Sequence, residues 1–311
     1  MITNHHVGCD ISKNTIDTFD GSGAGHKRID NSPNEIAKWL TQYVGSGACF
    51  IYEATGAYGM ALSRTLAEFS LPGIVVNPMR ARRFAQSRGV AAKTDKVDAR
   101  MLADMASRFE LEPSRPFDPI REALKALIFR RDQLTEQRGA DAKRLLQCND
   151  ILASESLKRA ISFFSAEIKI IQTQIDEQLA SQKDLARDHA LLKTVPGIGS
   201  TTATLLLALL PELGDCLPKA IASLSGCAPQ ARESGMHEPP RKISGGRPRV
   251  LKALYMAALA AIRTKTQLAE KYRYFRTNST HSKRPKVALI AIARKIVVTA
   301  NAVLRDKKAY I

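Results

Sequence analysis

Apolar and polar residues alternate along the start of the chain in a pattern typical of short β-strands. Residues 7–20, VGCDISKNTIDTFD, alternate with a polar break at residues 12–14, as two strands joined by a tight turn would. Together with the segments that follow, this pattern predicts a mixed α/β domain with a central sheet over residues 1–118. The later elements expected are a strand near 26–30, a helix over about 33–44, a strand at 48–54, a helix at 59–69, a strand at 73–77, a helix at 78–87 and a helix from about Asp95.

The middle of the chain has a helical pattern throughout. Between Pro119 and Leu192 there is no further proline and one glycine, Gly139. Apolar residues step by three and four, which is the spacing of a coiled-coil seam and also of ordinary core helices, so both interpretations stay open. We expect a helical coiled-coil linker over residues 119–192. The seam positions are Ile161, Phe164, Ile168, Ile171, Ile175 and Leu179.

A third segment begins with LLKTVPGIGSTTATLLLALLPE. A hydrophobic residue followed by Pro-Gly-Ile-Gly and an apolar helix resembles the hairpin of helix-hairpin-helix DNA-binding motifs, whose free backbone N–H groups accept a phosphate. A plain turn capped by Thr201 or Thr202 is the open alternative. A loop rich in glycine and proline and a helical region follow, so residues 193–311 are predicted to be a mostly α C-terminal domain.

Charge narrows the class of partner. The formal net charge is +17, and the segment from Ser200 to Ile311 holds 20 Lys and Arg against 6 Asp and Glu. Such an uneven excess of basic residues favours a polyanionic binding partner, although a basic surface that contacts only solvent would have the same composition. The phosphate-binding candidates are Arg80, Arg82, Arg83, Arg88 and Lys93 in one cluster, and Arg241, Lys242, Arg247 and Arg249 in a second.

Cysteine usage and hydropathy indicate a reducing, aqueous compartment. The five cysteines form no C-x-x-C pair, which indicates free thiols rather than a disulfide framework or a zinc site. The first ten residues lack a basic region followed by an apolar run, and the apolar stretch VALIAIARKIVVTANAVL is interrupted by Arg294 and Lys295. We therefore expect a cytoplasmic protein with no signal peptide and no membrane span.

Four carboxylates stand in an order that suggests a metal site. Asp10 and Glu53 end predicted strands, and parallel neighbouring strands would bring both to one end of the sheet. Asp95 and Asp98 lie three apart, on one face of the helix that follows. Taken singly, each has an ordinary structural explanation as a turn, edge, cap or first-turn residue. Together they predict bound Mg²⁺, which prefers oxygen ligands and offsets their repulsion.

The order strand-Asp, strand-Glu and helical Asp-x-x-Asp resembles the ribonuclease-H-like, RuvC-like fold of Holliday-junction resolvases. The segments GCDISKNTID, YEATGAYG, NPMRARRFAQSRGVAAKTDKVDARMLA, LSGCAPQARESG and ISGGRPRVLKALYMAA carry a closer resemblance. They are similar to DEDD-type insertion-sequence transposases related to Piv-type invertases, a family of bridge-RNA-guided recombinases. The similarity covers nearly the whole chain.

This resemblance implies roles for particular residues. Asp10, Glu53, Asp95 and Asp98 would be the metal-binding tetrad, and a C-terminal serine would be the nucleophile that forms a phosphoserine link to DNA. The family pattern places that serine at Ser234 in ARESGMHE. A second Ser-Gly at Ser244 in KISGGRPR departs from the family pattern, so the sequence leaves both serines as candidates and favours Ser234.

The leading hypothesis is an Mg²⁺-dependent DNA recombinase in a bacterial cytoplasm. It would act on donor and target DNA as a homo-oligomer, a dimer or a tetramer, with a noncoding guide RNA. A RuvC-like nuclease with water as nucleophile and a non-catalytic nucleic-acid-binding protein are the alternatives. A sugar kinase or actin-like ATPase is disfavoured by the positive charge and by the absence of a second glycine-rich phosphate loop.

Overall fold

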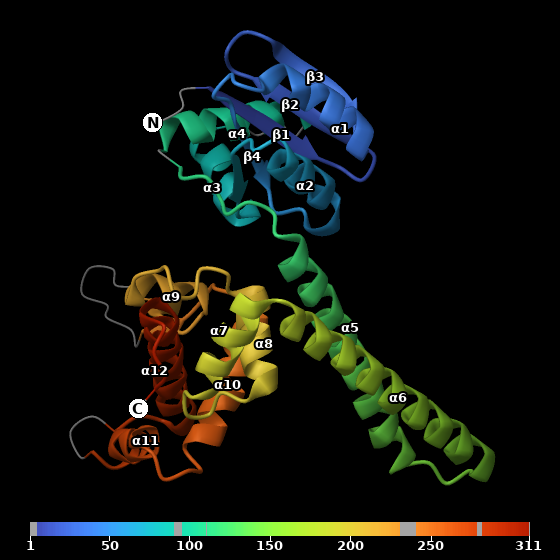
Figure 1. The fold of residues 1–311 in the computed structure, drawn as a ribbon, viewed down its shortest axis with the longest axis vertical. Coiled ribbons are helices and arrows are strands. Elements are labelled where there is room, and N and C mark those ends of the chain that lie inside the picture. Colours follow the sequence, from blue (N-terminus) through green and yellow to red (C-terminus); the bar gives the residue numbers. More distant parts are fainter. Residues whose placement is uncertain (1–4, 90–94, 110, 231–240, 279–281, 311) are drawn as a thin grey trace. The chain divides into compact units, whose positions relative to one another are not determined.

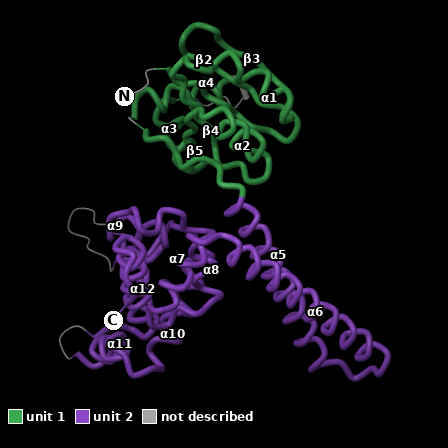
Figure 2. The backbone as a smooth tube through the Cα atoms, in the orientation of Figure 1, with its two compact units in different colours: residues 1–119 green, residues 120–311 purple. Residues whose placement is uncertain are grey.

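The chain folds into two compact units. A computed structural model describes residues 5–89, 95–109, 111–230, 241–278 and 282–310. Unit 1 comprises Met1–Pro119 and unit 2 comprises Ile120–Ile311, as Figure 2 shows in two colours. The boundary between them lies one residue beyond the predicted end of the first domain at residue 118.

Unit 1 is built on a five-stranded mixed sheet (Figure 1). The strand order is β3-β2-β1-β4-β5, in which β1, β2 and β3 are antiparallel neighbours and β1, β4 and β5 are parallel neighbours. The central position of β1 and the hairpin to β2 confirm the alternating pattern of residues 7–20. The strands are β1 (His6–Ile11), β2 (Thr15–Asp20), β3 (Gly25–Asp30), β4 (Cys49–Glu53) and β5 (Gly73–Val76).

Helices cover both faces of this sheet. Phe50 and Tyr52 of β4 pack into a core with α1 and α2, whereas Ile51 points to the opposite face and packs with α3 and α4. This alternation follows from the two-residue period of a strand. The helices of unit 1 are α1 (Pro33–Leu40), the 3-10 turns η1 (Thr41–Tyr43) and η2 (Gly56–Gly59), α2 (Met60–Glu68), α3 (Pro78–Ser87) and α4 (Asp95–Arg108).

Unit 2 is almost entirely helical, as its periodicity predicts. Its main core lies among α7, α8, α10 and α12, and a two-stranded ladder joins β6 to β7. Figure 1 shows α5 and α6 side by side as a long hairpin, and Arg131 of α5 donates to Gln172 of α6. The elements are α5 (Pro119–Leu145), α6 (Ile151–Ser181), α7 (Lys183–Lys193), α8 (Ser200–Leu209), α9 (Pro218–Leu224), β6 (Pro229–Gln230), β7 (Lys242–Ile243), α10 (Pro248–Ala261), α11 (Gln267–Thr277) and α12 (Pro285–Asp306).

The predicted seam of α6 packs against its own chain at one end. Ile175 and Leu179 are buried in the core that also contains Leu124 and Ile128 of α5. The same core continues into α8, α10 and α12, so α5, α6 and α7 form one compact unit with the helices that follow. A division of the helical region 119–192 from a separate domain 193–311 stays a prediction.

The turn before α8 is held by packing. Gly197 has φ +88°, and a Cβ atom there would lie 2.2 Å from the carbonyl oxygen of Ala257 in α10. Gly199 is the N-cap of α8 and no side chain caps the helix, so the cap by Thr201 or Thr202 that belonged to the alternative interpretation is not found. Gly197 of Pro-Gly-Ile-Gly therefore has a structural reason at this turn, and phosphate binding there stays a prediction.

Helix α12 is the main core helix of unit 2. Among the described residues it is the one helix long and apolar enough to cross a membrane by length and composition, but most of its apolar residues are buried inside the unit. Asn301 fixes it further: its side chain accepts from Gly214 N at 2.9 Å and donates to Cys216 O at 2.8 Å. These contacts are those of a core helix.

Candidate active site

Asp10 and Glu53 are neighbours at one end of the sheet. In the parallel register of β1 and β4, Cys9 is the partner of Tyr52, so the next position on each strand holds a carboxylate. Opposed residues of a parallel pair share a face, and both carboxylates lie on the face covered by α3 and α4. Both are half-buried. The expected convergence of these two residues is therefore found.

A close helix contact brings Asp98 to the same end. A Cβ atom on Gly8 would lie 1.9 Å from the carbonyl oxygen of Ala99 and 2.8 Å from the nitrogen of Ala103, so α4 packs directly on the backbone of β1. Asp98 directly precedes Ala99 in α4, and Gly8 lies two residues before Asp10 in β1, so this contact carries Asp98 close to the part of β1 where Asp10 stands.

The other helical aspartate of the predicted tetrad begins α4. Asp95 is the first residue of α4, and its side chain lies outside the described residues. The half-buried Asp98 follows three positions later, on the same helical face. The structure therefore brings together Asp10, Glu53 and the backbone that carries both helical aspartates.

A buried aspartate that the sequence interpretation missed lies beside this site. Asp17 of β2 is the cross-strand partner of Asp10, and it is 2% exposed. His26 Nε2 donates to its Oδ1 at 2.6 Å, and Arg28 binds its Oδ2 at 2.8 Å. Burial alone would raise the pKa of Asp17, but the hydrogen bonds and charges of Arg28 and His26 outweigh burial and lower it. The signal that the sequence offered was an acidic residue inside the predicted strand TIDTFD.

The turns that follow the two catalytic candidates on β1 and β4 are tied together. The side-chain amide of Asn31 donates to Ser12 O at 2.8 Å and to Tyr58 O at 3.0 Å. Ser12 lies two residues after Asp10, and Tyr58 lies five residues after Glu53. Asn31 therefore fixes the spacing of the two loops at the carboxylate end of the sheet.

The described side chains do not form a closed metal cage. No group of three or more His, Cys, Asp and Glu in the described part of the chain could hold an ion. Asp10, Glu53 and Asp98 each interact with other groups of the protein, and the side chain of Asp95 is outside this comparison. The donor set itself consists of carboxylate oxygens, which is the chemistry that Mg²⁺ prefers.

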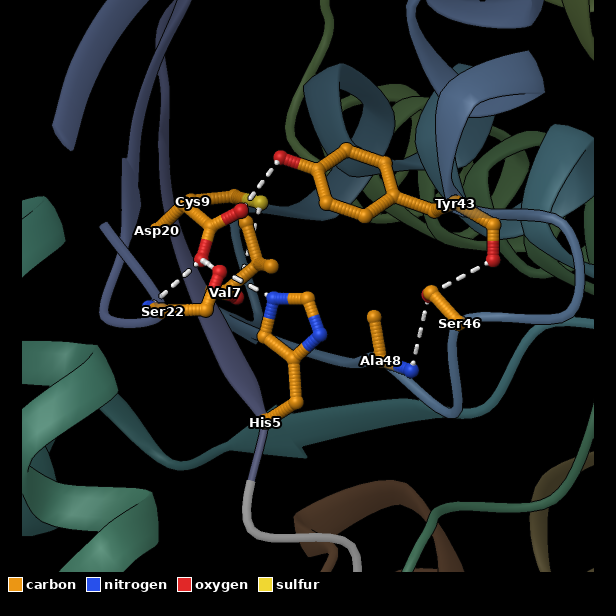
Figure 3. Close-up of polar contacts among 8 residues, drawn as sticks. All are labelled: His5, Val7, Cys9, Asp20, Ser22, Tyr43, Ser46 and Ala48. Carbon is orange, nitrogen blue, oxygen red and sulfur yellow. Dashed lines mark hydrogen bonds and ion pairs between the residues drawn. The ribbon is translucent and has the colours of Figure 1, made fainter. Parts of the chain in front are cut away.

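A second polar cluster of unit 1 has a structural role (Figure 3). The buried Asp20 accepts from His5 Nε2 at 2.9 Å and from the hydroxyl of Ser22 at 2.7 Å, both at Oδ1, and from the hydroxyl of Tyr43 at Oδ2. Burial opposes ionisation, but the bonds from Ser22, His5 and Tyr43 outweigh it and lower the pKa of Asp20. Because the serine and the histidine bind the same oxygen of Asp20, the cluster differs from a nucleophilic triad.

The first basic cluster lies on the surface of unit 1. Arg80, Arg82, Arg83 and Arg88 are exposed, and Lys93 lies outside the described residues. Two of the exposed arginines already have partners, because Arg80 stacks over the ring of Phe109 and Arg88 lies 3.4 Å from a carboxylate oxygen of Asp104. A role of this cluster in binding nucleic acid stays a prediction.

The second basic cluster is divided between surface and structural contacts. Arg247 binds both carboxylate oxygens of Glu212 at 2.6 Å, and Arg249 pairs with Asp132 at 2.8 Å while stacking on Phe129. These two arginines hold α10 to the rest of unit 2, which the sequence pattern did not indicate. The exposed Arg241 and Lys242 lie on or next to β7.

The two candidate serines differ in what the structure describes. Ser234 lies outside the described residues, in the segment between β6 and β7. Ser244 is described: its hydroxyl donates to Gln230 Oε1 at 2.7 Å, and Gln230 Nε2 donates back to Ser244 O at 3.2 Å. These two hydrogen bonds join Gln230 of β6 to Ser244, which follows β7, and so extend the short β6–β7 ladder. Ser244 therefore has a structural function of its own.

Comparison with known proteins identifies the class. A family model for DEDD-type enzymes, described as "Transposase", matches residues 7–152, which include Asp10, Glu53, Asp95 and Asp98. The DEDD domain is ribonuclease-H-like, and the mixed sheet flanked by helices agrees with that fold. The protein is therefore a DNA transposase or recombinase.

A second match and three relatives define the family. A model described as "Transposase IS116/IS110/IS902 family" matches residues 189–273, and the chain belongs to this family. It is 27% identical to the pilin gene-inverting proteins of Moraxella lacunata and Moraxella bovis, over 98% of this chain and 97% of each relative. It is also 25% identical to an uncharacterized 42 kDa protein of the insertion element IS900 from Mycobacterium paratuberculosis, over 70% of this chain and 73% of that protein.

Proposed function

We propose that the protein cuts and rejoins DNA through a covalent phosphoserine intermediate, with Asp10, Glu53, Asp95 and Asp98 as the catalytic carboxylates. The observation that carries this proposal is the register of β1 and β4, which makes Asp10 and Glu53 neighbours beneath α4. Carboxylates crowded in this way repel one another, and a divalent cation offsets that repulsion. The relatives named for gene inversion support rearrangement rather than simple hydrolysis.

Mg²⁺ is the cation that the donor set favours. Asp10, Glu53 and the two helical aspartates would hold it, and when bound it would neutralise charge that develops on a DNA phosphate. The protein's own part is to fix these carboxylates: β1 and β4 set the first two, and the contact of Gly8 with α4 sets the position of Asp98. Asn31 holds the loops beside them.

Ser234 is the proposed nucleophile. Its hydroxyl oxygen would form a bond to phosphorus as a backbone P–O bond of the DNA breaks, which conserves the phosphodiester for rejoining. The contacts of Ser244 with Gln230 support this assignment, because they give Ser244 a reason to be present that is independent of catalysis. The test is recovery of a protein–DNA adduct that survives denaturant, expected for wild type and Ser244→Ala and lost in Ser234→Ala.

The outcome of this test separates the chemistry from the residue assignment. An adduct that persists in Ser234→Ala and disappears in Ser244→Ala would move the nucleophile to Ser244. Cleavage without an adduct in any variant would indicate water as nucleophile, which is the hydrolytic alternative. Gln230→Ala serves as a matched control. It removes the hydrogen bonds between Gln230 and Ser244 but keeps the hydroxyl groups of Ser234 and Ser244.

We further propose that a noncoding RNA guides target choice and that the protein works in the bacterial cytoplasm as a dimer or tetramer on donor and target DNA. Unpaired basic residues supply affinity for phosphates but carry little sequence information. We expect weak, unselective and salt-dependent DNA binding without RNA, and site-specific recombination when the element's RNA is added. RNA-free protein that recombines one defined site efficiently would contradict the guided mechanism.

A further inference from the structure

A basic groove on unit 2 has no assigned role. It lies along α11 and α12 beside the start of α9, and its volume is about 1110 Å³. This exceeds the roughly 300–1,000 Å³ typical of small-ligand sites, so an extended ligand fits it better than a compact metabolite. The basic and aromatic residues of its lining are Lys219, Lys271, Tyr274, Arg294, Lys295 and Tyr310.

Positive charge exceeds negative charge in the lining of this groove. Lys219, Lys271, Arg294 and Lys295 line it, and Glu270 is the one acidic residue of the lining. Within the described part of the chain none of the four cations is in an ion pair, unlike the paired arginines of α10. Like charges gathered in a concave surface raise the local potential and attract a polyanion.

Aromatic and apolar surface accompanies the charge. Tyr274 is 53% exposed, and Lys271 Nζ lies 4.8 Å from its ring centroid. Tyr310 closes another part of the groove, and its backbone N–H donates to Thr194 Oγ1 at 2.9 Å, which holds the C-terminal segment in place. Leu268 and Val298 add apolar surface. A base can stack on an exposed ring of this kind while its phosphates meet the cations.

We infer that this groove binds an unpaired DNA strand. Charge alone would suit a duplex, but stacking on Tyr274 requires a base whose face is free. Strand cutting and rejoining by a transposase releases such a strand, so the inference rests on the DNA-recombining activity of the family and is independent of which serine is the nucleophile. The two cations on α12 and those on α9 and α11 would contact phosphates of the DNA strand. The ring of Tyr274 would stack on one of its bases.

The test measures binding of the full chain to a fluorescent single-stranded oligothymidylate. The double variant Lys271→Gln with Lys295→Gln should weaken binding at least tenfold near 0.15 M salt, and it should reduce the slope of log affinity against log salt by about 0.7 for each charge removed. Tyr274→Leu should weaken binding about fivefold or more, whereas Tyr274→Phe, which keeps the ring, should bind like wild type.

Matched controls separate the groove from general charge. Lys286 is an exposed lysine of α12 outside the groove, and Lys265 is an exposed lysine just before α11. The control variant Lys265→Gln with Lys286→Gln removes the same charge and should bind within about twofold of wild type. Circular dichroism melting of each variant checks that unit 2 stays folded. Crosslinking of an oligonucleotide carrying iodouracil should label the peptide that contains Tyr274.

Three results would overturn the inference. The first is an equal loss of affinity in the control double variant, which would make the effect one of net charge. The second is a duplex, or an RNA of the same sequence, that binds the groove more tightly than the DNA strand and shows the same dependence on Tyr274. The third is a crosslink that avoids α11. Adduct formation by Ser234 is measured separately, so failure of either proposal is recognised by itself.

Discussion

Gly8 of β1 lies directly against Ala99 of α4, with no room for a side chain between them. A Cβ atom at this glycine would be 1.9 Å from the carbonyl oxygen of Ala99. Backbone cannot retreat as a flexible side chain can, so any other residue at position 8 must push the helix away from the strand. The position of Asp98 relative to Asp10 therefore depends on a residue that carries no chemistry itself.

Gly8→Ala should destabilise unit 1 by about 2 kcal/mol or more, because overpacking displaces α4. Urea unfolding followed by fluorescence measures it cleanly, because Trp39 is the single tryptophan of the chain and is buried in unit 1. The matched control is Gly21→Ala, where the nearest atom to a new Cβ is 3.7 Å away. Equal stability of the two variants would contradict the close packing.

Asp10→Asn and Glu53→Gln should each abolish formation of the covalent DNA adduct while the unfolding transition of unit 1 is retained. The two residues are register neighbours, so removing one charge relieves repulsion and we expect stability to stay equal or to rise slightly. The measurement is adduct yield in Mg²⁺ together with the Trp39 unfolding curve. A variant carrying both changes that still forms the adduct would exclude the tetrad as the catalytic group.

Acid should destabilise unit 1 through Asp17 and Asp20. Both have pKa values below the ordinary 3.8, so their stabilising contribution is complete above that pH and is lost as pH falls through their folded values. Asp17→Asn should cost about 2 kcal/mol at pH 7, since it breaks a buried charge pair, of which Arg28 is partly exposed. Below pH 3.8 the difference from wild type should shrink, as followed by Trp39 fluorescence.

Thiol reactivity should distinguish buried from accessible cysteines. Burial raises the pKa of Cys49 to about 11 and also raises the pKa values of Cys9 and Cys227. Cys148, between α5 and α6, and Cys216, just before α9, are both partly exposed. At pH 8 a thiol reagent should react first with these two residues, and the double variant Cys148→Ser with Cys216→Ser should remove the fast phase. Rapid labelling of Cys49 in the folded protein would contradict its burial.

Local patterns predicted the elements of unit 1 because alternation and turn residues are encoded within a few positions. The hairpin of β1 and β2, the parallel strand β4 and the start of α4 were all predicted, and with them the meeting of Asp10 and Glu53. Asp17 was missed because its importance comes from β3, which supplies His26 and Arg28 across the ladder. Pairing between strands is not visible in a single segment.

Long-range contacts also limited the interpretation of unit 2. Composition suggested that Arg247 and Arg249 face phosphates, whereas their carboxylate partners, Glu212 and Asp132, lie far away in the sequence. The groove residues Lys271 and Arg294 were not predicted to bind phosphate, because α11 and α12 must pack before their side chains meet. The counts of charged residues predicted that the surface is positive, but they could not predict where on the surface the positive charge lies.

The central place of α12 has a consequence for how the protein is made. Every other element of unit 2 precedes α12 in the sequence, so the ribosome synthesises α10, with its buried Val250 and Leu254, before the helix that packs against it. At roughly 5–20 residues per second, about 2 to 9 seconds pass between completion of α10 and completion of α12. Unit 1 has its own cores complete by then. The nascent chain should therefore carry a finished α/β unit while the apolar face of α10 is open to chaperones.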